Sequence, residues 1–545
     1  MRTNVITAAE MRAIDKNAVA LGMNPLQLME NAGSAVADSI LKNMPQADEN
    51  SKTVWFFAGL GNNGGDTFVA ARRLADKKIS SIVFLLGAEE QIKTAESKTN
   101  YSLLKKTDFV TVVEIKCESD LLAAIRFENI KKPAVLVDGI FGTGFSGKAK
   151  GLEKSAIEQI NQLKQQSPEI FVLAVDLPSG IAVSNDFSDS KSIVKADAVI
   201  TFHKMKSFLE ADSNDFGKII VEPIGIPNSA EKYIGVGDLS LLYRRNTISK
   251  KGDSGKVLVI AGGAYAGAPA LAGMAVLRAG CDIVTIAAPK SVFNSISSFS
   301  PELIVKKLSG DVLSETDVPY LIELIQSYDS VIIGPGFGTA PESLKAAAEL
   351  IPYLKKAVID ADMLRPEIFE ALESAALNRK SDSGFNQEFV ITPHYNEFLR
   401  AAAYFKIDLT AKRADNSETE LEKAAAAISG KLNATVLLKG PTDLISNGNA
   451  DESRYNLTGN SGMSVGGTGD VLAGAVGGLL SKNKPIVSAC CGAFICGSAG
   501  DLVFRKKGNS LIPSDILEKI PTVIKNQTKD KTKSKNEKKR NKTKK

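Results

Sequence analysis

Short apolar runs alternate with helical stretches along most of this chain, and this alternation is the strongest constraint on its fold. In the first half, strands are expected at Val54 to Ala58, Ile82 to Gly87, Ala134 to Asp138, Phe171 to Asp176 and Ala198 to Phe202. Each run is apolar at consecutive positions, so both faces of the strand must be covered, as in a parallel sheet between helices. The sequence therefore predicts the α/β class, with ligands bound beyond the carboxyl ends of the strands.

Two helices are expected before the first of these strands. Thr7 and Glu10 have the spacing of a capping box, in which each side chain bonds the backbone amide of the other residue. Asn24 followed by Pro25 is typical of an N-cap and a first helical position. The chain is thus predicted to begin with two helices and only then to enter a sheet.

A second alternating unit begins after the segment KKGDSG, which starts at Lys250. Its expected elements are strands at Val257 to Ala261, Ile283 to Ala288, Val331 to Gly334, Ala357 to Asp360, Phe389 to Ile391 and Thr435 to Lys439, and a Gly/Ala-rich helix from Gly267 to Ala279. We therefore predict two domains, residues 1–235 and 236–522, each a mostly parallel sheet with helices on both faces. Residues 523–545 form a separate tail.

The basic charge of the chain belongs to that tail. Residues 525–545 hold eleven Lys and Arg against two acidic residues, so the rest of the chain carries −4 of the total charge of +5. A Lys-rich segment without hydrophobic residues is predicted to be disordered. Counterion release would allow it to bind nucleic acid, but a solvated tail is the simpler interpretation, and no nucleic-acid partner is expected.

Composition excludes several other classes of protein. Nowhere do 18 apolar residues run together, so no membrane-spanning helix is expected. Two histidines and five cysteines without a CxxC pair argue against a zinc centre or a disulfide framework. The first fifteen residues contain acidic side chains and lack the apolar core of a secretory signal, which favours a cytoplasmic protein.

Three strands of the first half end in polar, glycine-rich loops. These are GLGNNGGD from Gly59, DGIFGTGFSGK from Asp138 and DLPSGI from Asp176. The first is expected to lead into a helix beginning at Asp66, whose amides would face an anion. The alternative is that glycine is needed only for the strand-to-helix turn, since the motif lacks the Rossmann fingerprint.

The ends of these strands offer a candidate metal site and a candidate acid/base. Asn63, Asp138 and Ser179 supply hard oxygen ligands at adjacent strand ends, and one carboxylate with neutral oxygens suits a monovalent cation better than zinc. Asp176 ends an apolar strand, where partial burial raises the pKa of a carboxyl toward a useful range. A turn-initiating role before Leu177-Pro178 is the alternative for Asp176.

In the second half the strongest motif is NSGMSVGGTGDVLAG, from Asn460 to Gly474. A helix starting in Gly466 to Gly469 would stabilise charge on a transferred phosphoryl group through its exposed amides and dipole. Asp470, in the first turn of that helix, is placed to take a proton from an attacking hydroxyl. The alternative is an ordinary glycine-rich helix start with an acidic residue favoured by the dipole.

Other loops of the second half are expected around the same cleft. They are Lys439-Gly440-Pro441-Thr442-Asp443, which could line an adenine-nucleotide site, Thr392-Pro393-His394-Tyr395-Asn396-Glu397, and Gly334-Pro335-Gly336-Phe337-Gly338. The small residues of the helix around Ala489 to Gly500 would let a flat base pack closely. A lone histidine such as His394 is more often structural, although it follows Thr-Pro at a predicted strand end.

On these motifs the chain resembles the bifunctional NAD(P)H-hydrate repair enzymes up to about residue 522. The first half is similar to the NAD(P)HX epimerase domain in GLGNNGGD, GIFGTGFSG and DLPSG. The second half is similar to the ribokinase-like NAD(P)HX dehydratase domain in KGDSGKVLVIAGG, GPGFG, TPHYNE and GMSVGGTGDVLAG. The resemblance implies a Rossmann-like N-terminal fold and a metabolite-repair enzyme that is both an isomerase and a lyase.

The resemblance also implies the substrate and the site residues of the first domain. The substrates are NADHX and NADPHX, in which water has added to the nicotinamide ring to give R and S epimers, and the domain interconverts them. Potassium would be held by Asn63, Asp138 and Ser179. Asp176 would act on the substrate, which would also contact Asn62, Asn63, Gly64, Gly65, Asp66, Gly142, Thr143, Gly144, Phe145, Ser146, Gly147 and Lys148.

For the second domain the resemblance implies phosphorylation of the S-epimer's hydroxyl, followed by loss of phosphate to regenerate NAD(P)H. ADP would be the phosphoryl donor and AMP a product, with magnesium neutralising the phosphates. Asp470 would be the base, and Ala268, Gly336 and His394 would contact the hydrate. The nucleotide would bind Lys439, Gly440, Pro441, Thr442, Asp443 and Gly469. Self-association is also expected from the resemblance.

The sequence departs from the family pattern at a few positions. Thr67 stands where glycine is usual, Tyr395-Asn396 replaces Pro-Gly, and Ser461 replaces proline. None of these changes removes a proposed catalytic group. Two competing hypotheses remain: a vitamin or sugar kinase fused to a non-catalytic binding module, and a scaffolding first half whose lysine tail recruits RNA.

Overall fold

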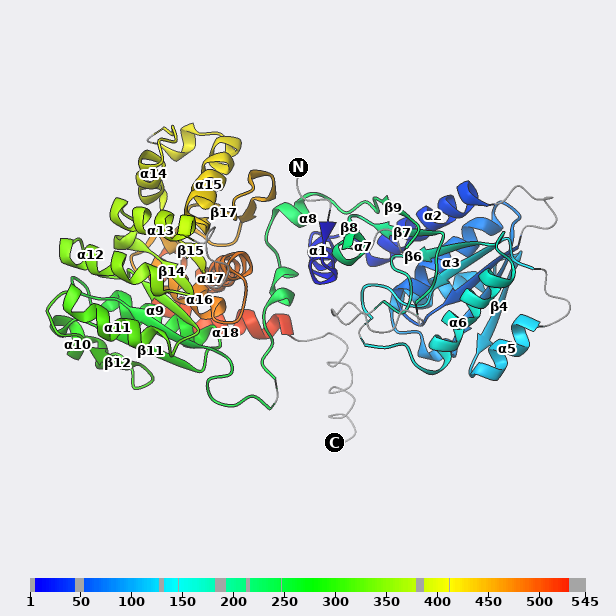
Figure 1. Cartoon of the computed structure of the whole chain (residues 1–545), viewed down its shortest axis with the longest axis horizontal. Coiled ribbons are helices and arrows are strands. Elements are labelled where there is room, and N and C mark those ends of the chain that lie inside the picture. Colours follow the sequence, from blue (N-terminus) through cyan, green and yellow to red (C-terminus); the bar gives the residue numbers. More distant parts are fainter. Residues whose placement is uncertain are drawn as a thin grey trace. The chain divides into compact units, whose positions relative to one another are not determined.

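The chain divides into two compact units, one spanning Thr3–Pro227 and the other continuing from Asn228 (Figure 1). The computed structural model describes residues 5–44, 53–126, 132–145, 147–181, 193–211, 216–246, 248–378, 387–410 and 412–528. The tail predicted from residue 523 begins later, because residues 523–528 belong to helix α18 (Pro513–Thr528), where Val523 is buried in the core. Residues 529–545 lie outside the described residues. The predicted α/β class is confirmed in both units.

The N-terminal unit is built on a sheet of seven parallel strands in the order β4-β3-β2-β5-β6-β7-β9. The strands are β2 (Thr53–Ala58), β3 (Ser80–Leu86), β4 (Val110–Ile115), β5 (Val135–Gly139), β6 (Phe171–Val175), β7 (Ala198–Phe202) and β9 (Lys218–Glu222). The direction of strand addition reverses between the neighbours β2 and β5. Ligands bind parallel α/β sheets beyond the strand ends at such a switch point.

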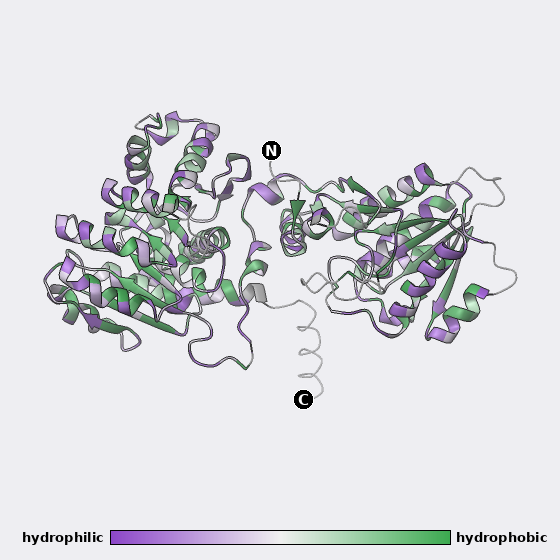
Figure 2. Ribbon diagram, viewed as in Figure 1, coloured by the Kyte–Doolittle hydropathy of each residue, from purple (hydrophilic) through white to green (hydrophobic). Residues whose placement is uncertain are grey.

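Helices cover both faces of this sheet, as the unbroken apolar runs predicted. They are α2 (Pro25–Asn43), α3 (Asn62–Ala75) and α4 (Ala95–Leu104), with α5 (Glu118–Arg126) and α6 (Gly151–Gln166) on the other face. All six residues of β2 are buried: Trp55 and Phe57 pack in the cluster beneath α5 and α6, while their neighbours face α3. Figure 2 shows these strands as the hydrophobic centre of the unit.

The two predicted N-terminal helices are present, and both caps form as expected. Helix α1 (Ala8–Ala20) starts with the Thr7–Glu10 capping box, in which the Thr7 amide donates to Glu10 Oε2 at 2.8 Å. Asn24 caps α2 by accepting the Leu26 amide at 2.9 Å. Before α1, strand β1 (Val5–Ile6) pairs in parallel with β8 (Met205–Lys206), which leads into α7 (Ser207–Ala211).

The prediction that the helix after GLGNNGGD begins at Asp66 is wrong, because α3 begins at Asn62. Gly61 is extended and serves as the N-cap, so the second half of the motif forms the first helical turn. The glycines in this turn are required by close packing: a Cβ on Gly64 would overlap the Gly59 carbonyl, and one on Gly65 would lie 2.5 Å from Met29 and Ser97. Such contact outweighs the low helix propensity of glycine.

The C-terminal unit contains a nine-stranded sheet in the order β12-β11-β10-β13-β14-β15-β16-β17-β18. Pairing is parallel as far as β16, and β17 and β18 continue antiparallel. The strands are β10 (Lys256–Ile260), β11 (Ile283–Ala288), β12 (Ile304–Lys307), β13 (Ser330–Ile333), β14 (Lys356–Ile359), β15 (Glu388–Ile391), β16 (Ala434–Leu438), β17 (Asp443–Ser446) and β18 (Arg454–Asn456). The switch point lies between β10 and β13.

Two helical layers cover this sheet. One layer contains α9 (Gly267–Arg278), α16 (Thr468–Leu480), α17 (Pro485–Lys507) and α18 (Pro513–Thr528). The other contains α11 (Val318–Ile325), α12 (Pro341–Leu350), α13 (Pro366–Asn378), α14 (Tyr395–Tyr404) and α15 (Glu418–Leu432), while α10 (Lys290–Ser297) lies beside the edge strand β12. The fold thus places the glycine-rich start of α16 beside α9.

Helix α17 is the part of the described chain that comes closest to a membrane span. The segment Pro485–Ser510 is long and apolar enough to cross a membrane by length and composition, with a mean hydropathy of 1.7 over its most apolar window. However, 72% of that window is buried inside the unit, where Cys490, Cys491 and Cys496 belong to the hydrophobic core. This helix packs as the core helix of a globular unit.

The change between units, at Pro227–Asn228, falls earlier than the predicted boundary at residue 235. Residues after 228 pack on the second sheet: the Ile234 amide donates to the Tyr455 carbonyl at 2.8 Å, and Lys232 pairs with Glu418 at 3.0 Å. Helix α8 (Ser229–Lys232) therefore belongs to the C-terminal unit. Pro223, Gly225 and Pro227 mark a loop at this point, but the sequence does not show that the residues after it pack on the second sheet.

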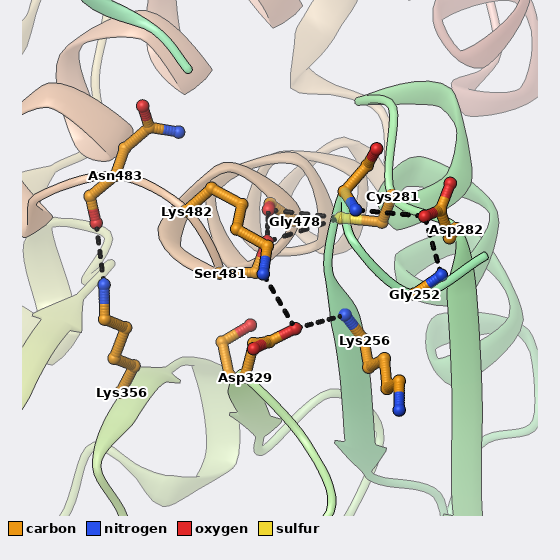
Figure 3. Close-up of polar contacts among 12 residues, drawn as sticks. Gly252, Lys256, Cys281, Asp282, Asp329, Lys356, Gly478, Ser481, Lys482 and Asn483 are labelled. Atoms are coloured by element: carbon orange, nitrogen blue, oxygen red, sulfur yellow. Dashed lines mark hydrogen bonds and ion pairs between the residues drawn. The ribbon is translucent and has the colours of Figure 1, made fainter. Parts of the chain in front are cut away.

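The KKGDSG segment lies at the amino ends of the strands of the second sheet, opposite the strand-end loops. Asp282 accepts the amides of Gly252 and Ser254 at 2.8 and 3.0 Å. Figure 3 shows the same edge, where Asp329 accepts the Lys256 amide at 2.8 Å and pairs with Lys482 at 3.4 Å. These contacts join the end of α16 to the strand starts and have a structural role.

Candidate functional site

The carboxyl ends of β2, β5 and β6 form the first candidate site. The Gly59 amide donates to the Gly139 carbonyl at 3.0 Å, and a Cβ on Gly59 would overlap the Ile140 carbonyl. A Cβ on Gly139 would likewise overlap the methyl group of Thr67, which is fully buried. The loops after β2 and β5 therefore touch along their backbones, and Thr67 takes the place of a smaller residue by packing on Gly139.

Asp138, Ser179 and Asn63 are brought together around the backbone of Phe141. The Ser179 amide and hydroxyl donate to the two Asp138 oxygens at 2.7 and 2.6 Å. The Phe141 amide donates to Ser179 Oγ at 2.9 Å, and Asn63 Nδ2 donates to the Phe141 carbonyl at 2.9 Å. All three side chains predicted to bind a cation thus lie in one hydrogen-bonded group.

This group has the chemistry of a monovalent cation site. Asp138 is fully buried, and burial raises the pKa of its carboxyl to about 6 despite the hydrogen bonds from Ser179 and Ile140. No Lys or Arg is among the described groups that shift its pKa. A desolvated carboxylate surrounded by a hydroxyl, an amide and a backbone carbonyl offers hard oxygen donors with one negative charge, which fits potassium.

Asp176 follows β6 in a left-handed backbone conformation, with φ of 62°. Aspartate tolerates this region better than most residues, but a non-glycine residue there is uncommon and is frequent at functional sites. The turn directs the carboxylate toward the Gly142 loop, where Oδ2 accepts the Thr143 amide at 3.1 Å. On the other side, Oδ1 lies 3.3 Å from Lys206 Nζ and 3.4 Å from Thr201 Oγ1.

The loop after β5 passes between Asn63 and Asp176. A Cβ on Gly142 would lie 3.1 Å from Asp176 Oδ2 and 3.4 Å from Asn63 Oδ1, whereas Gly144 and Gly147 border open space. Phe145 stacks on Phe141 with ring centroids 3.9 Å apart. The predicted substrate residue Lys148 is exposed, and Ser146 lies outside the described residues.

Two more carboxyl groups lie near Asp176. Burial, reinforced by the charges of Asp176 and Asp15, raises the pKa of Asp66 well above its usual value. The pKa of Asp15 rises to about 6, also mainly through burial, while Lys206 acts to lower it. Asn62, by contrast, is exposed at the start of α3. A neutral Asp66 can donate a hydrogen bond, which a carboxylate cannot.

In the C-terminal unit, the loops after β10 and β13 meet at the switch point. The Gly262 amide donates to the Pro335 carbonyl at 3.0 Å and the Tyr265 amide to the Gly336 carbonyl at 3.2 Å. A Cβ on Gly336, whose φ is 72°, would lie 3.2 Å from the Ala268 side chain. The structure therefore places Ala268 and Gly336, both predicted to contact the hydrate, side by side.

Lys439 lies at the centre of the second site. Its ammonium group pairs with Asp360 Oδ1 at 2.8 Å, and the same oxygen accepts Thr392 Oγ1 at 2.7 Å. A Cβ on Gly469 would lie 3.5 Å from Lys439 Nζ. Burial opposes the charge of Lys439, but the carboxylates of Asp360, Glu397 and Asp470 outweigh it and raise the pKa of the ammonium.

Asp470 stands in the first turn of α16, next to this cation. Burial raises the pKa of its carboxyl to about 7, with a contribution from Asp360 that Lys439 partly offsets. A carboxyl with a pKa near neutrality is suited to accept and return a proton at physiological pH. The N-cap of α16 is Gly467 in a left-handed conformation with φ of 99°, a position that favours glycine.

The Lys439–Asp443 turn joins β16 to β17 and is held by Arg413. The guanidinium donates to the Lys439 carbonyl at 2.8 Å and to the Thr442 carbonyl at 2.6 Å. Asp443 Oδ1 accepts the Gly440 amide at 3.0 Å, which closes the turn. Pro441 at its tip cannot donate a backbone hydrogen bond. Arg413 therefore fixes the shape of the loop predicted to bind a nucleotide.

His394 has a local structural role as the N-cap of α14. Nδ1 accepts the amides of Asn396 and Glu397 at 3.1 and 3.3 Å, and Nε2 lies 3.2 Å from Glu397 Oε1. Burial, with the charge of Lys439, lowers the pKa of the imidazole, whereas burial raises that of Glu397 to about 7. The neutral ring is half-exposed at the edge of the site.

The departure at Tyr395 has a visible consequence. Its hydroxyl donates to the Thr410 carbonyl at 2.7 Å and accepts Asn416 Nδ2 at 2.7 Å. Asn416 follows the short helix that contains Arg413, so Tyr395 helps to hold the arginine loop. The loop of residues 392 to 397 therefore keeps its helix start and gains a contact that Pro-Gly could not make.

Two of the small residues of α17 that were expected to leave room for a flat base are covered by other parts of the protein. A Cβ on Gly497 would overlap Thr458, and one on Gly500 would overlap the sulfur of Met463. The loop that leads into α16 packs directly against these two glycines. Their role is to let that loop approach the core.

Four residues of the two sites were not predicted from the sequence: Asp15, Lys206, Asp360 and Arg413. Asp360 had a usable signal, since it is the last residue of the predicted strand from Ala357, like Asp138 and Asp176 in theirs. Lys206, which is 1% exposed, had no such signal, because its burial depends on β1. Arg413 reaches the site from a loop 26 residues before Lys439.

Comparison with known proteins gives a consistent family. A family model described as YjeF-related protein N-terminus matches residues 25–208, and one described as NAD(P)H-hydrate dehydratase matches residues 257–522. A protein of Methanocaldococcus jannaschii is 38% identical over 527 residues, covering 96% of this chain and 94% of its own. One of Archaeoglobus fulgidus is 36% identical over 519 residues, covering 95% and 98%. Both are named bifunctional NAD(P)H-hydrate repair enzyme Nnr.

Among solved structures, the ADP/ATP-dependent NAD(P)H-hydrate dehydratase of Bacillus subtilis, co-crystallised with ATP and Mg²⁺, is 21% identical with a TM-score of 0.44. It covers 54% of this chain and 98% of its own. The assignment rests on the relatives of full length, whose identity exceeds one third across both units. The chain belongs to the family of bifunctional NAD(P)H-hydrate repair enzymes.

Proposed function

We propose that this chain repairs hydrated NADH and NADPH by two successive reactions at two sites. The N-terminal unit interconverts the R and S epimers of the hydrate, and the C-terminal unit converts the S form back to NAD(P)H at the expense of ADP. The observation that carries the proposal is that the candidate site of each unit holds a carboxylate near a lysine: Asp176 with Lys206, and Asp470 with Lys439.

For epimerisation, the N-terminal unit would hold the hydrate at the start of α3 and below the Gly142 loop. The first amides of α3 have no partner within the helix and suit a phosphate of the dinucleotide. Asp176, with both oxygens fixed, would exchange a proton with the substrate, and the buried Asp66 would donate a hydrogen bond to it. Asp176 and the start of α3 both lie at the carboxyl ends of the strands of this sheet.

Potassium would be held by Asp138, Ser179, Asn63 and the Phe141 carbonyl. When bound, it supplies positive charge that balances the buried carboxylate and attracts an anionic substrate. The raised pKa of Asp138 supports this assignment, since a carboxyl that resists ionisation in a dry site gains most from a cation. The residues themselves fix the loop that lies above Asp176.

For dehydration, the S hydrate would lie between the Ala268–Gly336 contact and Asp470. Asp470 would take the hydroxyl proton as the oxygen attacks the terminal phosphorus of the donor. Lys439 and the first amides of α16 would balance charge on the transferred group. The Lys439–Asp443 turn, held by Arg413, would carry the nucleotide.

Magnesium would reach this site with the nucleotide. Among the described residues, no group of three or more His, Cys, Asp or Glu side chains could hold a metal ion alone. That arrangement fits an ion bound largely through phosphate oxygens with one or two carboxylates, as is usual for magnesium. When bound, it neutralises phosphate charge.

The proposal is tested by measuring each reaction separately. Without nucleotide, the purified R hydrate should give a mixture of R and S on chromatography, faster than the spontaneous rate. With the S hydrate, ADP and magnesium, each NADH recovered should be matched by one AMP and one phosphate. A stable phosphorylated product without NADH would instead favour the kinase alternative.

A further inference from the structure

The segment that precedes the matched family region makes contacts with the N-terminal site. Strand β1 (Val5–Ile6) and helix α1 (Ala8–Ala20) both lie before residue 25, where the family match begins. Ile6 of β1 lies opposite Lys206 of β8 in the parallel pair. The pairing therefore fixes the segment on which Lys206 stands.

Lys206 has a partner for each proton of its ammonium group. Nζ donates to the Phe202 carbonyl at 2.7 Å and the Lys204 carbonyl at 3.2 Å, and it lies 3.3 Å from Asp176 Oδ1. With three donors and three acceptors, the group has a single orientation. The lysine is 1% exposed, so water does not compete for Asp176 on this side.

Arg12 of α1 reaches the loop on the opposite side of Asp176. Its Nη1 donates to the Thr143 carbonyl at 2.7 Å, and the Thr143 amide donates to Asp176 Oδ2 at 3.1 Å. Thr143 is thus held from both of its backbone polar groups. Asp15, three residues after Arg12 on the same helical surface, lies in the field of Lys206.

We propose that Arg12 and Lys206 are positioning residues for epimerisation, so that the β1–α1 segment is a working part of that site. Arg12 holds the substrate loop through Thr143, and Lys206 orients the Asp176 carboxylate. The inference rests on the proposed function of the N-terminal unit. It makes different predictions for the two residues, because one contacts the loop and the other contacts the acid/base itself.

The test uses the full chain with Arg12→Ala, Arg12→Lys and, as a matched control, Lys16→Ala, which removes an exposed cation from the same helix. Initial rates are measured over a range of purified R hydrate, with the Asp176→Ala chain in excess to convert the S product. Loss of one charge-assisted hydrogen bond should raise KM roughly tenfold in Arg12→Ala with little change in kcat. Arg12→Lys should restore much of the loss, and Lys16→Ala should match the wild type.

Lys206→Met provides the second arm of the test. Because Lys206 orients the Asp176 carboxylate, this variant should have a lower kcat and an unchanged KM for the R hydrate. Because this change removes a buried ammonium and its bonds to the Phe202 and Lys204 carbonyls, the unfolding temperature of the variant is measured first. If the variant does not fold, the Arg12 arm decides the matter. A wild-type KM in Arg12→Ala, or an equal rise in Lys16→Ala, would overturn the positioning role. A wild-type chain that does not epimerise would overturn the proposed function itself, while unchanged dehydration of the S hydrate in every variant reports an intact C-terminal unit.

Discussion

At the scale of single residues, each candidate site places a carboxylate near a lysine: Asp176 beside Lys206, and Asp470 in the field of Lys439. In the C-terminal unit, burial and Asp360 raise the pKa of Asp470, while Lys439 limits the rise to about 7. Lys439 in turn is held by Asp360 at 2.8 Å. The same cation that would balance phosphoryl charge thus tunes the base.

Dehydration should therefore respond to pH through Asp470. The base acts in its ionised form, so the rate should rise as pH increases through about 7, the pKa of Asp470, and level off above it. Initial rates of NADH recovery from the S hydrate, at saturating ADP between acid and alkaline pH, measure this profile. Asp470→Asn should lower the rate by about 10²- to 10⁴-fold, the usual contribution of a general base.

Glu397 provides the control for that profile, because its pKa also lies at about 7 through burial. If Asp470 is the titrating base, Glu397→Gln should keep the rising limb. If the rise in rate with pH disappeared in Glu397→Gln but remained in a partly active Asp470→Asn, the titrating group would be Glu397 and not Asp470.

Asp138 should link potassium to the stability of the N-terminal unit. Its folded pKa of about 6 exceeds that of an unfolded aspartate, so the folded form is favoured at low pH and loses this contribution as pH rises through about 6. A cation at the site should offset that loss. Calorimetry at pH 7 should show one unfolding transition shifted upward by KCl relative to choline chloride at equal ionic strength.

The shift should vanish in Asp138→Asn and persist in Asp470→Asn, which removes a buried carboxyl from the other unit. An equal response of all three chains to KCl would mean that the ion acts nonspecifically. The midpoint that moves also identifies which unit binds the ion, since the two units are expected to unfold separately.

Residues at the end of a predicted strand, or in the loop after it, could be found from the sequence. Asp138, Asp176 and Ser179 were identified because the ends of parallel strands converge. Lys206 and Arg413 were not, because each is brought to its site by segments remote in sequence, β1 in one case and the loop before α15 in the other. Local patterns in the sequence do not show which distant segments will come into contact.

At the scale of elements, the N-terminal site requires close backbone packing at the start of helix α3. Gly64→Ala would place a Cβ against the Gly59 carbonyl inside the first turn. Overpacking of this kind costs roughly 1–3 kcal/mol, and here it would displace the strand-to-helix loop. Epimerisation should be strongly reduced while dehydration of the S hydrate stays at the wild-type rate.

Gly61→Ala is the matched control in the same loop. Gly61 has a φ of −104°, and nothing lies within 4 Å of its Cβ position, so alanine should be accepted. Epimerisation rates of the two variants, with unfolding temperatures, decide the point. Equal loss in both would mean that the loop requires glycine for flexibility rather than for close packing.

The elements themselves were largely predictable. Apolar runs located the central strands to within one or two residues, and both N-terminal caps formed as expected. The start of α3 was missed because glycines normally end helices, and only tertiary contact with Gly59 and Met29 explains them inside one. The short β1 and β8 were missed because each has two residues, too few to show a period.

At the scale of the whole molecule, the two sites lie in separate compact units with separate sheets. Each unit has its own hydrophobic core, so a substitution in one core should not disturb the other. The product of epimerisation is a free small molecule. The two activities should therefore be separable by mutation and recoverable by mixing.

A mixture of Asp176→Ala and Asp470→Ala chains should thus convert mixed R and S hydrate epimers completely. Each chain alone should fail: the first converts the S form quickly and the R form only at the spontaneous rate, and the second regenerates no NADH. The time course of NADH recovery from the mixture, compared with the wild type at equal site concentration, measures this complementation. Failure of the mixture would require transfer of substrate within one chain.

The central claim is that one chain performs both steps of NAD(P)H-hydrate repair, with Asp176 and Asp470 as the reacting groups. Recovery of absorbance at the reduced-nicotinamide band, from mixed hydrate epimers with potassium, magnesium and ADP, tests it most directly. We predict complete recovery by the wild type, a biphasic course for Asp176→Ala and none for Asp470→Ala. No recovery by the wild type with either ADP or ATP would contradict the account.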